Sequence, residues 1–490
     1  MHSFFKIVGI ASAIIAIIVL ISANLALAGG EKIPLTTKSE KAKEYFIKGR
    51  QLADKLRIQE SQEYFQKAVD EDPNFALARL NLAFAQPTTV AFFDSFNKAK
   101  ALADKASEGE RLQILGFEAL GLNGDAAAQL EMYQKLIQLY PDDERAHNLL
   151  GNHYFGQQKY DKAIEQYEIA MKINPEFSQP LNQLGYAYRF QEDYARSERA
   201  FKKYIALIPN DPNPYDSYAE MLLKIGRHDE SIKNYEKALQ INPGFVNSHF
   251  GIASNYLYKG EPDMARKQLQ KFYDNAVNDG QRRTALTLMA VTYVDEGRFD
   301  DAFKMLDKQY DFAAAISDTS AMAGDFVQRG NVLLAAGSPE KALQYYKKAV
   351  DIIQASSRSD EIKKQNKLGY LYNAGRANVA MGQLAEAKGM AEKFSKAAQA
   401  AHTQFQIYQA YELNGLIAMA EKRYDDAIEN FAAGNPLDPN IIFQLAKAYE
   451  ASGDKKMAQK FYDKAADFNP LLNLRYAFIR NDARTKMASM

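Results

Sequence analysis

The stretch KAIEQYEIAMKINPEF, residues 162–177, returns as ESIKNYEKALQINPGF, residues 230–245. A third version, SQEYFQKAVDEDPNF, occupies residues 61–75. The prolines of the three copies are separated by multiples of 34 residues. Self-similarity at a fixed period of this size indicates an array of small structural repeats rather than one globular core.

The repeating unit is defined by counting back from these prolines. Seven units then follow one another in unbroken 34-residue phase, beginning at Ala42, Ala76, Glu110, Glu144, Ser178, Pro212 and Val246. In most units the eighth and twentieth residues are small, as Gly151 and Ala163 are in the fourth, which lets two helices approach closely. Proline at position 32, such as Pro175, cannot continue a helix. Each unit is therefore predicted to be a helix, a turn and a second helix.

This pattern resembles the tetratricopeptide repeat, whose signature has Gly or Ala at position 8, Ala at positions 20 and 27, and Pro at position 32. The fourth unit has all four residues: Gly151, Ala163, Ala170 and Pro175. The resemblance extends over about residues 42–470. It implies an all-α fold, an α-α superhelical solenoid of about 11–12 helix-turn-helix units.

The regularity of the array changes along the chain. Residues 42–280 keep the 34-residue phase, whereas the spacing varies over residues 281–470, which predicts lengthened helices or loops. The later units are expected to begin at Arg283, Ala323, Leu368, Tyr408 and Pro439. Residues 471–490 are predicted to form a C-terminal capping helix, because the last repeat of such an array needs its outer face covered. We expect Arg480, Arg484 and Lys486 on its solvated side.

Composition excludes several classes of function. Lys plus Arg and Asp plus Glu both total 61, so no net charge attracts the chain to nucleic acid, and we expect no nucleic-acid partner. The sequence contains no cysteine, which rules out disulfide bonds, thiolate metal sites and a cysteine nucleophile.

The first 28 residues read as a targeting segment. Lys6 precedes an uncharged run from Ile7 to Ala28, and Ala26-Leu27-Ala28 suits a signal peptidase. We expect a signal peptide at residues 1–28 and export to the periplasm or the exterior. The alternative is an uncleaved membrane anchor at residues 7–28, which are long enough to cross a bilayer. The membrane is a partner only in that second case.

No residue pattern predicts catalysis. Phosphate-loop, HExxH and GxSxG motifs are absent from the sequence. Glu144 and His147 share one helical face, but a carboxylate-bridged metal site needs further ligands and a second copy of this pair. We therefore expect no catalytic residue, no metal and no cofactor, and an enzyme with an unrecognised site stays an alternative.

The first helix of each unit carries the candidate binding surface. If positions 4, 8 and 11 pack against neighbouring helices, positions 2, 5, 9 and 12 face the hollow of the superhelix; we name these the groove positions. With position 6 of the fifth unit added, they nominate Arg145, Asn148, Asn152, Gln179, Asn182, Gln183, Tyr186, Arg189 and Asn213. Asn and Gln both donate and accept hydrogen bonds, which suits an extended peptide backbone.

The resulting hypothesis is a non-enzymatic scaffold of the cell envelope or exterior that binds an extended peptide or partner protein in its concave groove. It expects the groove amides of Asn148, Asn152 and Asn182 to be solvated until a partner arrives. The opposing interpretation is that these amides are ordinary polar residues of a solvated wall. An envelope assembly factor, a chaperone-like adaptor within a larger complex and an extracellular adhesion protein remain alternatives.

Overall fold

The computed structural model describes residues 32–489 except residues 56, 87–88 and 402–403. The expected signal peptide or anchor, residues 1–28, lies outside them. All regular elements in the described part are helices, which confirms the all-α prediction. No helix among these residues is both long enough and apolar enough to cross a membrane.

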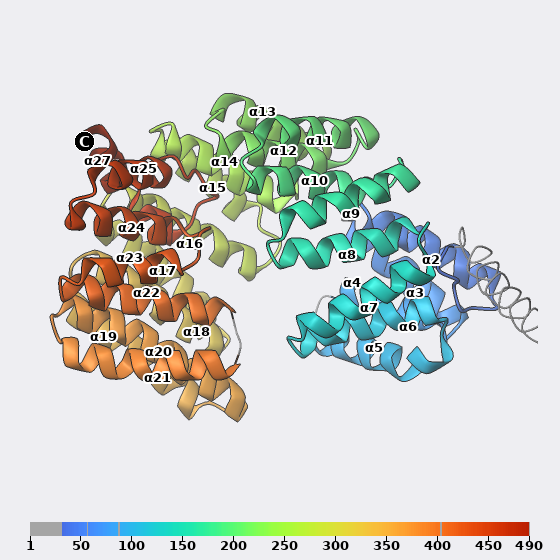
Figure 1. Ribbon diagram of the computed structural model, residues 1–490, viewed down its shortest axis with the longest axis horizontal. Coiled ribbons are helices and arrows are strands. Elements are labelled where there is room, and N and C mark those ends of the chain that lie inside the picture. Colours follow the sequence, from blue (N-terminus) through green and yellow to red (C-terminus); the bar gives the residue numbers. More distant parts are fainter. Residues whose placement is uncertain (1–31, 56, 87–88, 402–403, 490) are drawn as a thin grey trace, which may run out of the picture. The chain divides into compact units, whose positions relative to one another are not determined.

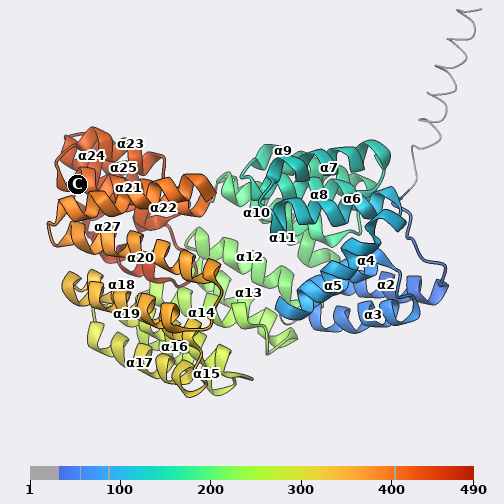
Figure 2. The same ribbon diagram turned by 90° about the horizontal axis from the view of Figure 1, so that it is seen from below.

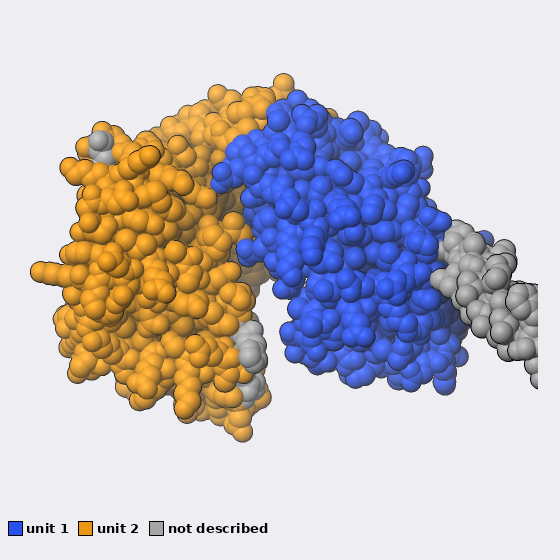
Figure 3. Space-filling model, viewed as in Figure 1, with its two compact units in different colours: residues 1–221 blue, residues 222–490 orange. Residues whose placement is uncertain are grey.

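The chain divides into two compact units, unit 1 (residues 1–221) and unit 2 (residues 222–490), coloured separately in Figure 3. The helices of unit 1 are α2 (Glu40–Ala53), α3 (Ile58–Glu71), α4 (Ala76–Ala85), α5 (Thr89–Leu102), η1 (Ala103–Lys105), α6 (Glu108–Phe117), η2 (Glu118–Leu122), α7 (Ala126–Leu139), α8 (Glu144–Gly156), α9 (Tyr160–Ile173), α10 (Ser178–Phe190) and α11 (Tyr194–Leu207). The division falls inside α12 (Pro212–Lys224).

Unit 2 continues with α13 (His228–Ile241), α14 (Val246–Tyr258), α15 (Pro262–Asp274), α16 (Asp279–Asp295), α17 (Phe299–Ala315), α18 (Thr319–Ala335), α19 (Pro339–Ala355), α20 (Asp360–Ala380), α21 (Leu384–Ala401), α22 (Gln404–Ala420), α23 (Tyr424–Ala432), α24 (Pro439–Ser452), α25 (Lys455–Ala466), α26 (Leu474–Ala477) and α27 (Arg480–Ser489). In the described residues α2 to α25 form 12 consecutive pairs. Figures 1 and 2 show neighbouring pairs side by side within each unit, for example α2 and α3 beside α4 and α5.

Small residues at position 8 lie where the two helices of a pair meet. A Cβ atom added to Gly151 would lie 2.5 Å from Cε1 of Tyr167, and one added to Gly185 would lie 2.5 Å from Cε1 of Phe201. Tyr167 and Phe201 are fully buried at position 24 of their units. The repeat signature thus records a close contact between a small residue on the first helix and an aromatic ring on the second.

Longer helices account for the looser phase of the later repeats. α8 and α9 have 13 and 14 residues, whereas α16 to α19 each have 17 and α20 has 21. The extra turns change the spacing between units without disturbing the pairing. The short contact between Gly330 and Tyr346 in α18 and α19 repeats the geometry of the earlier pairs.

The C-terminal residues form two short helices, α26 and α27, instead of the single capping helix expected at 471–490. α27 does pack on α25, the last helix of the array, whereas α26 lies against α16 and α24. The expectation that Arg480 is solvated is wrong, because its side chain is 6% exposed and paired with Asp295. Sequence reasoning failed here because the partner lies 185 residues away.

Candidate functional site

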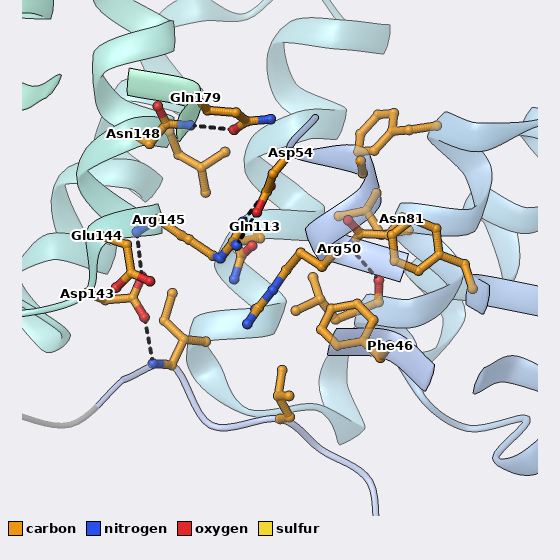
Figure 4. Close-up of a pocket in the computed structure, with 18 of the residues that line it drawn as sticks. Phe46, Arg50, Asp54, Asn81, Gln113, Asp143, Glu144, Arg145, Asn148 and Gln179 are labelled. Carbon is orange, nitrogen blue, oxygen red and sulfur yellow. Dashed lines mark hydrogen bonds and ion pairs between the residues drawn. The ribbon is translucent and has the colours of Figure 1, made fainter. Parts of the chain in front are cut away.

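Unit 1 contains a cavity of about 740 Å³ beside the first helices of its repeats. We name it the unit 1 cavity; Figure 4 shows 18 of its lining residues. Residues 32–35, α2, α3, α4, α6 and α8 contribute to its wall. Most of the large side chains are apolar, among them Ile33, Phe46, Phe65, Leu80, Phe84 and Phe117. Its size and apolar character are those of a ligand pocket.

The extended residues before α2 form one side of this cavity. The backbone N–H of Ile33 donates to Asp143 Oδ2 at 2.9 Å, and that of Thr36 donates to Glu110 Oε1 at 3.0 Å. Lys32 pairs with Glu144. Acidic side chains at the beginning of α6 and α8 therefore hold an extended stretch of this chain by its backbone.

An ion pair between Arg145 and Asp54 lies on the polar side of the unit 1 cavity. Arg145 forms a two-pronged ion pair with Asp54, with Nη1–Oδ1 and Nη2–Oδ2 distances of 3.1 and 2.6 Å. Its guanidinium also lies 4.6 Å from the ring centroid of Phe177. Arg145, a predicted groove residue, is thus fixed by the fold and has its charge neutralised.

Arg50 extends from the opposite wall toward Arg145 (Figure 4). Its guanidinium lies 5.3 Å from the ring centroid of Phe46. No hydrogen bond or ion pair joins the Arg50 guanidinium to any described residue. Burial, and next the nearby charge of Arg145, lower the pKa of Arg50 to about 10. Asp54, Asp143 and Glu144 attract Arg50 only at longer range, so the cavity contains a cation without an ion-pair partner among the described residues.

The sequence prediction missed Arg50 although its signal was present. Arg50 and Phe84 are the ninth residues of the first two units, and position 9 is a groove position. The groove positions were read only from the best-conforming units, between Glu144 and Val246. Applied to the first two units, the same rule would have found both residues.

Several predicted amides form a hydrogen-bonded network inside the wall. Asn148 is 5% exposed, and its Nδ2 donates to Gln179 Oε1 at 3.1 Å. Asn152 Oδ1 accepts from the Tyr167 hydroxyl at 2.8 Å and from Gln183 Nε2 at 3.3 Å. The expectation that these amides are solvated in the free protein is therefore wrong for Asn148, whereas Asn152 is partly exposed with its Oδ1 already bonded.

The same amides surround a smaller cavity of about 100 Å³ next to the first. Asp54, Asn152 and Gln179 line both cavities, and Asn182 and Gln183 line only the smaller one. The Oδ1 atoms of Asn148 and Asn182 are buried without a hydrogen-bond partner among the described residues. The structure therefore brings six predicted residues, Arg145 and these five amides, to the two adjoining cavities, and their role in binding stays a prediction.

The remaining predicted residues are engaged elsewhere in unit 1. Glu220 accepts from the Tyr186 hydroxyl at 3.0 Å and from Arg189 Nη1 at 2.6 Å. Burial, followed by the Glu220 charge, raises the pKa of Tyr186. Asn213 Nδ2 donates to the Tyr204 hydroxyl at 2.9 Å. Through these contacts Tyr186, Arg189 and Asn213 connect successive repeats to one another.

Unit 2 presents its groove positions to the C-terminal segment of the chain, residues 468–489. The backbone N–H of Leu472 donates to Ser254 Oγ at 3.0 Å, and the carbonyl of Pro470 accepts from the Tyr258 hydroxyl at 2.8 Å. Ser254 stands at position 9 of its unit. The segment is therefore held by its backbone in unit 2, 212 and 218 residues away from these partners.

Two arginines anchor the C-terminal segment. Arg475 forms ion pairs with Glu412 (Nη2–Oε2, 2.9 Å) and with Asp438 (Nε–Oδ2, 2.5 Å). Burial alone would lower the pKa of Arg475, but the surrounding Tyr372 hydroxyl and these carboxylates raise it. Arg480 Nε pairs with Asp295 Oδ1 at 2.6 Å. Glu412 is at position 5 of its unit, so a groove position again receives the segment.

Candidate metal ligands are engaged in other contacts. Glu144 pairs with Lys32, whereas His147 has Nδ1 at 2.8 Å from Gln166 Oε1 and Nε2 at 2.9 Å from the Pro141 carbonyl. Throughout the described ranges no three His, Cys, Asp or Glu side chains are grouped so as to hold a metal ion.

Comparison with known proteins gives three relatives by name. A tetratricopeptide repeat and J domain-containing co-chaperone of Cryptococcus neoformans is 31% identical over 109 residues, which are 21% of this chain and 20% of that protein. The chain thus spans about a fifth of that relative's length. A tetratricopeptide repeat protein from Parabacteroides merdae is 16% identical, with a TM-score of 0.39, over 53% of this chain and 97% of that one. The MamA protein is 24% identical, with a TM-score of 0.30, over 34% and 89%.

Family comparison identifies the repeats themselves. The tetratricopeptide repeat family matches residues 144–177, 178–211, 213–245 and 439–470, and the tetratricopeptide repeat-like domain matches residues 246–369. These segments together make up more than half of the chain and support its interpretation as a protein-interaction scaffold. The chain is a multi-repeat member of the tetratricopeptide repeat family.

Proposed function

We propose that this protein binds an extended segment of a partner protein on the groove positions of unit 1, without catalysing a reaction. The observation that carries the proposal is the C-terminal segment in unit 2. There, Ser254 at groove position 9 and the neighbouring Tyr258 bond to the backbone of the non-helical residues 470–472, and Glu412 at groove position 5 pairs with Arg475 in the short helix α26. Unit 1 offers the same groove positions and, in addition, a cavity of about 740 Å³.

An exposed apolar surface at the unit 1 cavity favours a protein partner. Phe84 is 49% exposed and Ile58 40% exposed, and both line the cavity. The Phe84 ring lies 4.7 Å from that of Phe117, edge to face. Clustered exposed aromatic and aliphatic side chains typically mark an interaction site, because water contact with them is unfavourable.

Site-specific photocrosslinking tests this function. Phe84 would be replaced by p-benzoylphenylalanine in the full chain, and Lys67, an exposed residue on the second helix of the first pair, would be replaced in a matched control. Irradiation with an envelope extract should give a discrete adduct from position 84 and none from position 67. Equal yields from both positions would refute groove binding, and mass spectrometry would identify the captured protein.

We also propose that the protein works outside the cytoplasm, on the basis of Lys6, the apolar run and Ala26-Leu27-Ala28. N-terminal sequencing of the native protein should find Gly29 as the first residue, and the protein should leave the membrane fraction without detergent. A native N-terminus at Met1 would instead support the anchor at residues 7–28.

A further inference from the structure

The unpaired guanidinium of Arg50 is unusual among the arginines of this fold. Arg145 is neutralised by Asp54, Arg283 pairs with Asp325 at 2.8 Å, and Arg480 pairs with Asp295. The guanidinium of Arg50 contacts the face of Phe46, and the carboxylates of Asp54, Asp143 and Glu144 attract it from beyond ion-pair distance, each more weakly than Arg145 repels it. Keeping a half-buried cation without an ion pair costs free energy, so an occupant that supplies a direct counter-charge gains that interaction.

The walls of the unit 1 cavity restrict the occupant to a single negative charge. Asp54, Asp143 and Glu144 also line the cavity, and each would repel a second anion. Asp54 is already paired with Arg145 and Glu144 with Lys32. Lys43 also lines the cavity but is exposed to solvent, so Arg50 is the half-buried cation available to an occupant. A carboxylate satisfies Arg50 with one charge, whereas a phosphate brings nearly two.

The remaining lining requires apolar groups on either side of that carboxylate. Phe84 is 49% exposed, Phe117 and Ile33 are partly exposed, and all three line the cavity, whereas Phe46 and Phe65 are already fully buried. A free polar anion would leave the exposed apolar groups in contact with water. An occupant with large apolar groups beside its carboxylate would cover both kinds of surface.

Unit 2 shows the complementary arrangement within the same molecule. Its groove supplies the carboxylates of Glu412 and Asp438, and the segment that it holds supplies Arg475 between Leu474 and Tyr476. In unit 1 the charges are reversed: the arginine, Arg50, belongs to the wall of the cavity, so the occupant is expected to supply the carboxylate. The occupant of unit 2 is a polypeptide segment, which favours a polypeptide for unit 1 as well.

We propose that the unit 1 cavity receives an acidic residue flanked by large apolar residues, in an extended segment of the partner protein. This inference rests on the proposed function and specifies the chemistry of its ligand. The acidic side chain pairs with Arg50, while its neighbours contact Ile33, Phe84 and Phe117.

The test begins with a random heptapeptide display library selected on the full chain. Enriched peptides should carry Glu or Asp next to Leu, Ile, Phe or Tyr. Each would be synthesised with blocked ends, together with a counterpart that has Gln or Asn in place of the acid. The acidic form should bind the native chain at least about tenfold more tightly, as expected for a charge-assisted hydrogen bond in a desolvated site.

Variants of the chain attribute that preference to Arg50. Arg50→Gln should reduce the ratio of the two affinities to about one, while Arg50→Lys should retain part of it, because it retains the charge. Arg57→Gln is the matched control: Arg57 is exposed, pairs with Glu60 and does not line the cavity, so the preference should persist. Thermal unfolding of Arg50→Gln should match the native chain, since no internal ion pair is lost.

The outcomes separate this inference from the function on which it rests. Selected peptides that bind the groove with no preference for an acid would overturn the inference and leave peptide binding intact. Failure to enrich any peptide, together with no adduct at position 84, would overturn both. Binding of decanoate that depends on Arg50, without binding of any peptide, would show that the site takes a small amphipathic acid and would overturn the polypeptide ligand.

Discussion

Arg475 and Arg50 are both partly buried and both lie in a groove, but in opposite electrostatic surroundings. Arg475, in unit 2, meets Glu412 and Asp438, and its pKa is raised. Arg50, in unit 1, forms no ion pair with a described residue, and burial lowers its pKa to about 10 although Asp54, Asp143 and Glu144 oppose that shift. The difference teaches that the groove of unit 2 is filled by the C-terminal segment, whereas in unit 1 no described residue pairs with Arg50, and this contrast is the basis of the ligand that we propose for unit 1.

The C-terminal segment is therefore informative about how these repeats bind a polypeptide. Ser254 and Tyr258 bond to its backbone, while carboxylates on the repeats receive its arginines. The backbone contacts do not depend on the sequence of the bound segment. The ion pairs do, because they require an arginine at defined positions of that segment. The same division of roles is expected in unit 1, with charges of opposite sign.

The largest expected effect on stability comes from removing the ion pair between Arg480 and Asp295, which anchors the C-terminal segment in unit 2. Arg480→Met leaves Asp295, which is 3% exposed, as a buried carboxylate without its ion pair, and should cost about 3–5 kcal/mol. Hydrogen exchange should show loss of protection in residues 468–489 and in α16. Denaturant unfolding of unit 2 would give the free-energy change.

A double variant provides the control for that experiment. Arg480→Met combined with Asp295→Leu removes both charges and should recover most of the lost stability, because no unpaired charge remains. A double variant as unstable as Arg480→Met alone would mean that packing, rather than the ion pair, holds the C-terminal segment.

The close packing of Gly185 on the Phe201 ring in unit 1 gives the next largest effect on stability. Gly185→Ala places a Cβ 2.5 Å from two ring atoms of Phe201 and should cost about 1–3 kcal/mol. Gly389→Ala, in the middle of α21 with nothing within 4 Å, should instead be neutral or stabilising by up to about 1 kcal/mol. Urea denaturation would measure both changes.

The location of the Gly185→Ala damage tests the repeat architecture. Hydrogen exchange should lose protection around residues 144–221 and remain unchanged after residue 320, because the helix that carries Gly185, α10, packs on α8, α9 and α11. Uniform loss over both units would contradict an array.

The amide network in the wall of unit 1 is expected to contribute less. Asn152→Ala removes the acceptor of the fully buried Tyr167 hydroxyl and should cost about 1 kcal/mol. Asn182→Ala is the comparison variant, because Oδ1 of Asn182 has no hydrogen-bond partner among the described residues. This variant should lower the melting temperature less than Asn152→Ala does. A larger drop in melting temperature for Asn182→Ala than for Asn152→Ala would show that these hydrogen bonds do not determine how much each amide contributes to stability.

The smallest effect concerns pH. Lys486, by hydrogen bond and charge, lowers the pKa of Glu450 at the contact between α24 and α27. A lowered carboxyl pKa gives stability above the ordinary value of 4.5, which is lost as pH falls through the folded-state pKa. Because both side chains are partly exposed, the loss should stay below about 1 kcal/mol. Glu450→Gln should abolish the acid-induced loss of protection in α27, and an unchanged acid response would contradict the assignment.

The sequence predicted the repeat fold because its signature records local contacts, such as that of Gly151 with Tyr167. It also predicted that Asn152, Asn182 and Gln183 lie at one surface, since regular repeats fix which residues share a face. It could not predict the pairs of Arg145 with Asp54 or Arg480 with Asp295, which depend on how distant repeats curve toward one another. Arg50 became significant only once its lack of a partner was visible.

Hydrogen exchange of the full chain, with and without a selected acidic peptide, tests the central claim most directly. We predict new protection in residues 33–37, α2 and α4 of unit 1, and no change in residues 468–489, which the groove of unit 2 already protects in the free protein. Protection in unit 2, or release of the C-terminal segment when the peptide binds, would show that the peptide competes for the occupied groove and would contradict the account.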